Sequence, residues 1–169
     1  MANEILKAFH ETTEQLLQTI ALFTQEQFNT IPFEDSWTAA QVTEHVYKAE
    51  SAMPGILQGN TRSTERATDA NVDVIKNIFL NFSTKLKSPE FILPSNADIV
   101  QDKEERYKAI KANREAIERL AGTVDLSLTY TAFALPNIGE LTGIEWLVFH
   151  ASHSTRHIHQ LKNIYKALL

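Results

Sequence analysis

The sequence has 169 residues, of which 43% are hydrophobic, and a formal net charge of −5. This length and composition suit a single domain, residues 1–169, because a chain of this size buries roughly two-thirds of its unfolded surface. The acidic balance argues against nucleic-acid binding, which needs a concentrated basic stripe. The sequence also has no apolar run of about 18 residues that would span a membrane.

The N-terminal segment is amphipathic and acidic, unlike a signal peptide, so we expect a cytoplasmic protein with neither a membrane nor a nucleic-acid partner. The chain has no cysteine, which excludes disulfides, zinc thiolates and thiol nucleophiles. Any polar chemistry must therefore come from histidines, carboxylates, hydroxyls or a bound cofactor. The six histidines are the natural candidates.

Apolar residues spaced by three and four predict the first two helices. Helix one is expected from Asn3 to about Phe28. After a stretch of helix breakers, Thr38 and Gln41 have the spacing of a capping box, so helix two should begin near Thr38. Pro54 lacks a backbone N–H and should kink or shorten the last turns of this helix.

The region from Gly59 to Gln101 is expected to form a long crossover. Its apolar spacing predicts an extra helix between Val72 and Leu86, and its prolines predict an extended segment at residues 88–94. A crossover of this length would allow helices two and three to run parallel.

Helix three is expected from an N-cap at Asp102 to a stop at Gly122. Thr142 and Glu145 form a second capping-box sequence, which should open a last helix running almost to the C-terminus. Strands are not expected, although residues 126–130 could form one short extended piece. The predicted fold is therefore all-α: a four-helix bundle with a long crossover between helices two and three.

A helical wheel of the last helix sorts its histidines into two groups. His159 lies on the predicted solvent face, which also carries Glu145, Ser152, Arg156, Asn163 and Lys166. His150, His153 and His157 instead share a stripe with Trp146. These three imidazoles are expected to point into the bundle.

A buried histidine is often just a hydrogen-bonded core residue, so a metal-free bundle is one interpretation of this stripe. Several buried imidazoles are costly, however, unless each nitrogen finds a partner. His153 and His157, four residues apart, can chelate one ion. His45, on the inward stripe of helix two, is the best third ligand. His10 points beside the core and is a weaker candidate.

Two motifs resemble the DinB-like superfamily of helical metal proteins, which includes the YfiT-like group of metal-dependent hydrolases. The segment Ser36-Trp37-Thr38 followed by His45 is similar to the start of the family's second helix. The segment from His153 to Gln160 is similar to the family's H-x-x-R-H-x-x-Q motif on the last helix. The resemblance implies that His45, His153 and His157 are the metal ligands.

Other polar residues near these motifs have less defined roles. Gln160 lies one turn beyond the second motif histidine and could orient a ligand ring. His150 is the candidate catalytic residue, lining the mouth of the site with residues 91–94 and moving a proton; substrate contact or packing are the alternatives. Arg156 is expected to be structural. Glu44 and Glu50 are expected to be solvated carboxylates.

Three neutral imidazoles leave an open position on a divalent ion, Zn, Ni, Fe or Mn, and this favours hydrolysis of a small-molecule substrate by metal-activated water. The resemblance also allows a transferase that uses a low-molecular-weight thiol at the same site. A non-catalytic, stress-associated metal-binding bundle is a further alternative. The broad apolar arcs of helices one and three predict a homodimer.

Overall fold

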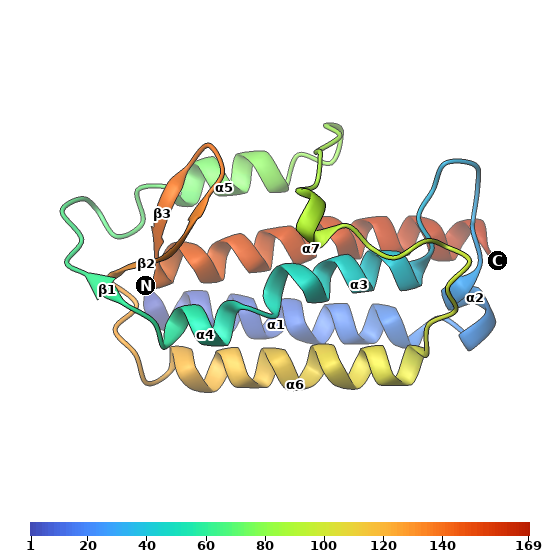
Figure 1. The fold of residues 1–169 in the computed structure, drawn as a ribbon, viewed down its shortest axis with the longest axis horizontal. Coiled ribbons are helices and arrows are strands. Elements are labelled where there is room, and N and C mark those ends of the chain that lie inside the picture. Colours follow the sequence, from blue (N-terminus) through green and yellow to red (C-terminus); the bar gives the residue numbers. More distant parts are fainter.

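Four long helices lie side by side in the computed structural model, which describes all 169 residues (Figure 1). They are α1 (Ala2–Ala21), α3 (Ala39–Glu50), α6 (Lys103–Ala121) and α7 (Gly143–Ala167). Helices α1 and α3 each contact both α6 and α7. Helices α3 and α6 run in one direction and α1 and α7 in the other, as the long connection between α3 and α6 allows. None of the helices is long and apolar enough to cross a membrane.

Side-chain caps fix where three of these helices begin. Thr38 and Thr142 each accept a hydrogen bond from the backbone N–H three residues on. The side chains of Gln41 and Glu145 in turn accept from the N–H of the capping residue, which completes both capping boxes. Asp102 caps α6 with its carboxylate. The predicted starts of these three helices are confirmed.

The helix expected from Asn3 to Phe28 is in fact two helices. Helix α1 ends at Ala21, and α2 (Gln25–Asn29) begins at its own capping box on Thr24. Because the Thr24 hydroxyl binds the first turn of α2, the chain changes direction there instead of continuing α1. Residues 24–27 have the same capping-box spacing as residues 38–41, so the break has a local signal in the sequence, which the apolar spacing up to Phe23 outweighed.

Helix α3 ends at Glu50, and α4 (Met53–Leu57) follows it with Pro54 in its first turn. Proline is tolerated there because the first N–H groups of a helix have no partner within the helix. The predicted interruption at Pro54 is confirmed.

The crossover contains three short elements, namely β1 (Thr61–Arg62), α5 (Val72–Phe79) and η1 (Glu90–Ile92). The extra helix ends well before Leu86, where it was expected to end. The Asn81 side chain accepts hydrogen bonds from the backbone N–H and the hydroxyl of Ser83, which closes a turn directly after α5. This local turn overrides the apolar spacing that continues beyond it.

The sequence predicted no strands apart from a possible short extended piece at residues 126–130, and this prediction is wrong, because a small antiparallel sheet of order β1-β2-β3 is present. Its strand β2 overlaps that piece only at Thr129 and Tyr130. Strands β2 (Thr129–Leu135) and β3 (Gly139–Thr142) form a hairpin whose turn places Asn137 and Gly139 at positive φ. The β2–β3 register shifts between Thr129 and Ala134. This irregularity breaks the strict alternation by which strands are recognised in a sequence.

The hydrophobic core has two parts, one toward each end of the long helices. The first surrounds the start of α7 and includes Phe9, Met53, Ile75, Ile117, Leu141, Trp146 and Leu147. The second includes Leu16, Ile20, Phe28, Val42, Ile110, Leu161 and Ile164. Between these two sets, each long helix contributes buried polar residues, namely Thr12 and Thr13 of α1, Glu50 of α3, Arg114 of α6 and Ser154 of α7.

This polar layer is built on an ion pair between Glu50 of α3 and Arg114 of α6, both almost fully buried. Arg114 Nε donates to Glu50 at 3.0 Å, and Nη1 donates to the Thr13 hydroxyl of α1 at 3.1 Å. The Ser154 hydroxyl of α7 donates to Glu50 at 2.9 Å. The expectation that Glu50 is solvated is therefore wrong, and one ion pair joins all four long helices.

Candidate metal centre

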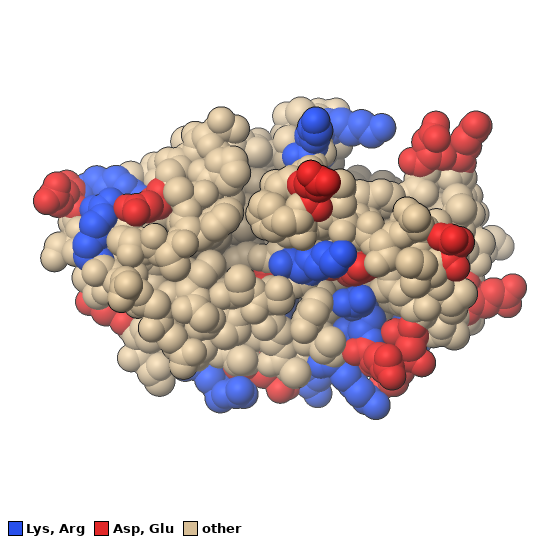
Figure 2. All heavy atoms as spheres, viewed as in Figure 1, with Lys and Arg blue, Asp and Glu red and all other residues tan.

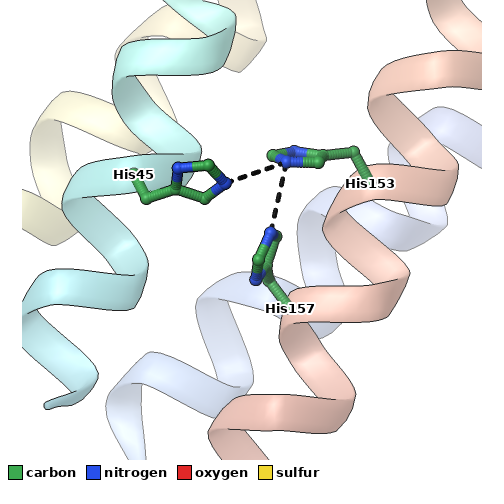
Figure 3. Close-up of side chains that lie close together, drawn as sticks. All are labelled: His45, His153 and His157. Atoms are coloured by element: carbon green, nitrogen blue, oxygen red, sulfur yellow. Dashed lines mark hydrogen bonds between the residues drawn. The ribbon is translucent and has the colours of Figure 1, made fainter. Parts of the chain in front are cut away.

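The three histidines expected to act together meet between α3 and α7 (Figure 3). His153 and His157 lie one turn apart on α7, and His45 faces them from α3. The Nε2 atom of His153 lies 3.1 Å from Nε2 of His45 and 3.2 Å from Nε2 of His157. All three residues are buried, and their ring nitrogens lie within 4.8 Å of one another.

Hydrogen bonds on the far side of two rings fix the direction of their lone pairs. His45 Nδ1 lies 2.9 Å from the carbonyl oxygen of Ile92, which can only accept, so Nδ1 carries the proton. His157 Nδ1 lies 2.8 Å from Oε1 of Gln160 and donates to it. In a neutral imidazole the other nitrogen is then a bare acceptor. The Nε2 lone pairs of His45 and His157 therefore both point at His153.

His153 cannot satisfy both of these lone pairs, because its Nε2 carries at most one proton. Its Nδ1 is buried and has no hydrogen-bond partner. Without a cation, the cluster leaves buried acceptors facing one another, which is unfavourable. A metal ion among the three Nε2 atoms would satisfy all of them, since Zn–N distances of about 2.0–2.1 Å give tetrahedral N···N separations of about 3.3 Å.

The surroundings keep these rings neutral, the form in which imidazole binds a metal. Burial lowers the pKa of His45. Burial, followed by the neighbouring imidazoles, lowers the pKa of His153 well below its ordinary value. Burial and then His45 lower the pKa of His157 to about 3. The cluster is thus a set of neutral donors that could hold a metal ion.

The cluster opens into a cavity of about 680 Å³ that all three histidines help to line. Its walls come from α3, α4, α5, the crossover, the β2–β3 hairpin and the part of α7 from Trp146 to His157. Phe91 and Ile92 line it, as expected for residues 91–94, whereas Leu93 and Pro94 do not. The volume falls within the range of about 300–1,000 Å³ typical of small-molecule sites.

His150 is not part of the cavity lining, so the expectation that it lies at the mouth of the site is wrong. Its ring is buried and stacks on Trp146, with centroids 5.8 Å apart and planes at 19°. Its Nδ1 has no partner, and burial lowers the pKa of His150 to about 4. Its predicted catalytic role stays a prediction. Trp146 and Phe149, which pack against it, do line the cavity.

Three other expectations on α3 and α7 need correction. Ser152, which was expected on the solvent face of the last helix, is buried. Glu44 is buried rather than solvated; it accepts hydrogen bonds from Ser95 and pairs with Lys48, and these contacts lower its pKa to about 2 despite the opposing effect of burial. Glu145 is not on a solvent face, because Arg66 of the crossover binds both of its carboxylate oxygens. A helical wheel cannot show a crossover segment that covers its polar arc.

The remaining candidates lie away from the cluster or support it. His159 is exposed, as expected, and stacks on Phe82. His10 is exposed and contacts Glu118. Arg156 is half-buried and lines the cavity, where its guanidinium donates to the backbone carbonyls of residues 81 and 84.

A mostly helical chain with buried imidazoles converging beside a cavity defines a class of protein: a helical protein with a candidate mononuclear metal centre. Residues 8–161 match the DinB superfamily, and the chain belongs to that superfamily. The searches of curated proteins and of solved structures give no match.

Proposed function

We propose that this chain is a metal-dependent hydrolase of the DinB-like four-helix-bundle type, with His45, His153 and His157 as the ligands of one divalent ion. The observation that supports the proposal is the pair of hydrogen bonds made by Nδ1 of His45 and Nδ1 of His157, on the ring edges that face away from the cluster. The Ile92 carbonyl and the Gln160 side chain fix two rings so that bare Nε2 atoms converge on His153. Such outer contacts are typical of histidines that ligate metals.

An ion held by three neutral imidazoles keeps a position open and supplies an acidified water and a Lewis acid at neutral pH. The protein's own residues would hold and orient the substrate beside it. Phe79, Phe91 and Phe149 help to line the cavity and would exclude bulk water from the reacting bond.

The cavity favours catalysis over a purely structural ion. A structural zinc site is closed by four protein ligands, whereas this cluster offers three and faces about 680 Å³ of open volume. The same cavity could also accept a low-molecular-weight thiol, so a thiol-dependent transferase is the second candidate. A thiolate would occupy the same open position as the water.

Metal analysis of protein purified without a histidine tag tests the proposed ligands. We expect one divalent ion per chain in the unmodified protein, and its loss in His45→Ala and His157→Ala. His159→Ala is the matched control on α7 and should retain the full metal content, because its ring is exposed and away from the cluster. Undiminished metal in His45→Ala, or equal loss in His159→Ala, would refute the assignment.

Cobalt substitution then tests whether the ion has an open position. Addition of azide or a small thiol should change the visible absorption spectrum of the cobalt protein. A spectrum that no such ligand changes would contradict the catalytic proposal and favour a structural ion. Comparing ester hydrolysis with thiol transfer separates the two catalytic candidates.

A further inference from the structure

The charged residues that line the cavity are all basic. They are Lys48 of α3, Lys87 of the crossover and Arg156 of α7, and no aspartate or glutamate is among the lining residues. This asymmetry is unexpected in a chain whose formal net charge is −5. Glu90 lies close by on η1, but it is exposed and outside the lining.

Two of these cations lack a carboxylate partner. Lys48 pairs with Glu44 at 2.9 Å, so its charge is compensated. Neither Arg156 nor Lys87 takes part in any ion pair of the chain. Arg156 donates only to backbone carbonyls, so no carboxylate compensates its charge. The cavity therefore carries uncompensated positive charge.

Along α7 the cavity lining changes from aromatic to cationic residues. Along α7 the lining residues run from Trp146 and Phe149 through His153 to Arg156 and His157. At 1.5 Å per residue, Trp146 and Arg156 are about 15 Å apart along the helix axis, with His153 about 4.5 Å from Arg156. At the Trp146 end, the hairpin adds apolar residues including Phe133, Leu135 and Ile138.

The surface view agrees with this division. Figure 2 shows basic side chains on both sides of η1, over α3 and beside the end of α5, with an acidic side chain at η1 between them. A hollow between the β2–β3 hairpin and η1 is bordered mainly by uncharged atoms. The exposed rings of Phe91 and Phe133 approach each other across the cavity, with centroids 6.3 Å apart.

We propose that the cavity binds amphipathic anions, with the acidic group at Arg156 and Lys87, an apolar chain against Trp146 and the β2–β3 hairpin, and the reacting bond between them at the three histidines. This inference rests on the proposed function for the position of the reacting bond. A small hydrophilic anion would leave the apolar end unfilled. A neutral apolar molecule would leave the positive charge of Arg156 and Lys87 without a counter-ion.

Calorimetric titration of the purified protein with probes of equal chain length tests the ligand class. Decanoate should bind about tenfold or more tightly than decanol or decyltrimethylammonium, since a charge-assisted contact adds at least this much affinity. Acetate should bind much more weakly than decanoate. Equal affinities for decanoate and decanol, or for decanoate and acetate, would overturn the proposal.

Substitutions locate the acidic group. Lys87→Glu changes an exposed side chain and should weaken decanoate binding about tenfold. Lys162→Glu is the control, because Lys162 is exposed on α7 and outside the cavity, and it should leave the affinity unchanged. Arg156→Gln should weaken binding at least as much as Lys87→Glu, with unchanged helical circular dichroism. Unchanged decanoate affinity in both Lys87→Glu and folded Arg156→Gln would refute the assigned position.

The titrations are repeated after removal of metal by a chelator, and the metal content is measured separately. A preference for decanoate that persists without metal supports the cationic end as its source. A preference that disappears with the metal overturns the assignment to Arg156 and Lys87. Absence of metal from the purified protein would instead refute the proposed function, without changing the order of affinities predicted for the probes.

Discussion

The buried ion pair between Glu50 and Arg114 offers a sharp test of how the metal centre is held in place. The substitution Glu50→Gln keeps the size of the side chain and removes its charge, which leaves Arg114 as a buried cation. Breaking a buried pair in this way costs about 3–5 kcal/mol. Glu50 and Arg114 are 1% and 0% exposed, so solvent cannot supply the missing charge.

We therefore expect Glu50→Gln to lower the free energy of unfolding by about 3 kcal/mol, and the melting temperature of a chain of this size by about 10 °C. Urea unfolding of metal-free protein measures the change without the stabilisation that a bound ion would add. Glu115→Gln on the same helix as Arg114 is the control. Its carboxylate is 52% exposed and lies 3.9 Å from Lys111, so its loss should cost less than about 0.5 kcal/mol.

The same substitution should also reach the metal centre. Glu50 binds Ser154, the residue after His153, and it lies on the helix that carries His45. Loosening this contact should widen the spread of His45–His153 separations and weaken metal binding. The double variant Glu50→Leu/Arg114→Met should recover most of the stability, because apolar pairs often replace buried ion pairs at no cost. A loss below about 1 kcal/mol in Glu50→Gln would refute the argument.

Three further predictions follow from the contacts around the site. Gln160→Ala removes the acceptor that orients His157 and should weaken metal binding about 10–100-fold in a competition titration; unchanged affinity would show that the contact at 2.8 Å does not orient the ring. The pKa of His150 is lowered to about 4 from 6.5, so the unfolded chain takes up this proton first, and the contribution of His150 to stability should fall by about 3 kcal/mol as the pH drops from 6.5 to 4. The lowered pKa values of His45, His153 and His157 add further losses. His150→Gln should flatten the dependence of the unfolding free energy on pH between 6.5 and 4, measured by urea unfolding, and His159→Gln should not. If His150→Gln retains the metal, its activity decides whether His150 has the predicted catalytic role. The homodimer stays a prediction. Sedimentation should show a dimer at micromolar concentration, and finding only monomer would refute it.

The sequence by itself determined the helix starts and the histidines that face inward. Thr38, Asp102 and Thr142 cap their helices through bonds to residues three positions away, so the signal is local and readable. His153 and His157 share a helix face for the same reason, because spacing along one helix fixes direction. The motif resemblance to the DinB superfamily depended on such short-range patterns, and the family match confirms it.

Only the tertiary structure decided what covers the polar faces and what lies across from them. Glu50, Glu44 and Glu145 look solvated on a helical wheel, but their partners are 64, 51 and 79 residues away in the chain, at Arg114, Ser95 and Arg66. The tautomer of His45 likewise depends on Ile92, 47 residues away, whereas that of His157 depends on Gln160 of the same helix. Pairing over such distances depends on how the crossover folds back over the helices, and periodicity within one helix carries no information about it.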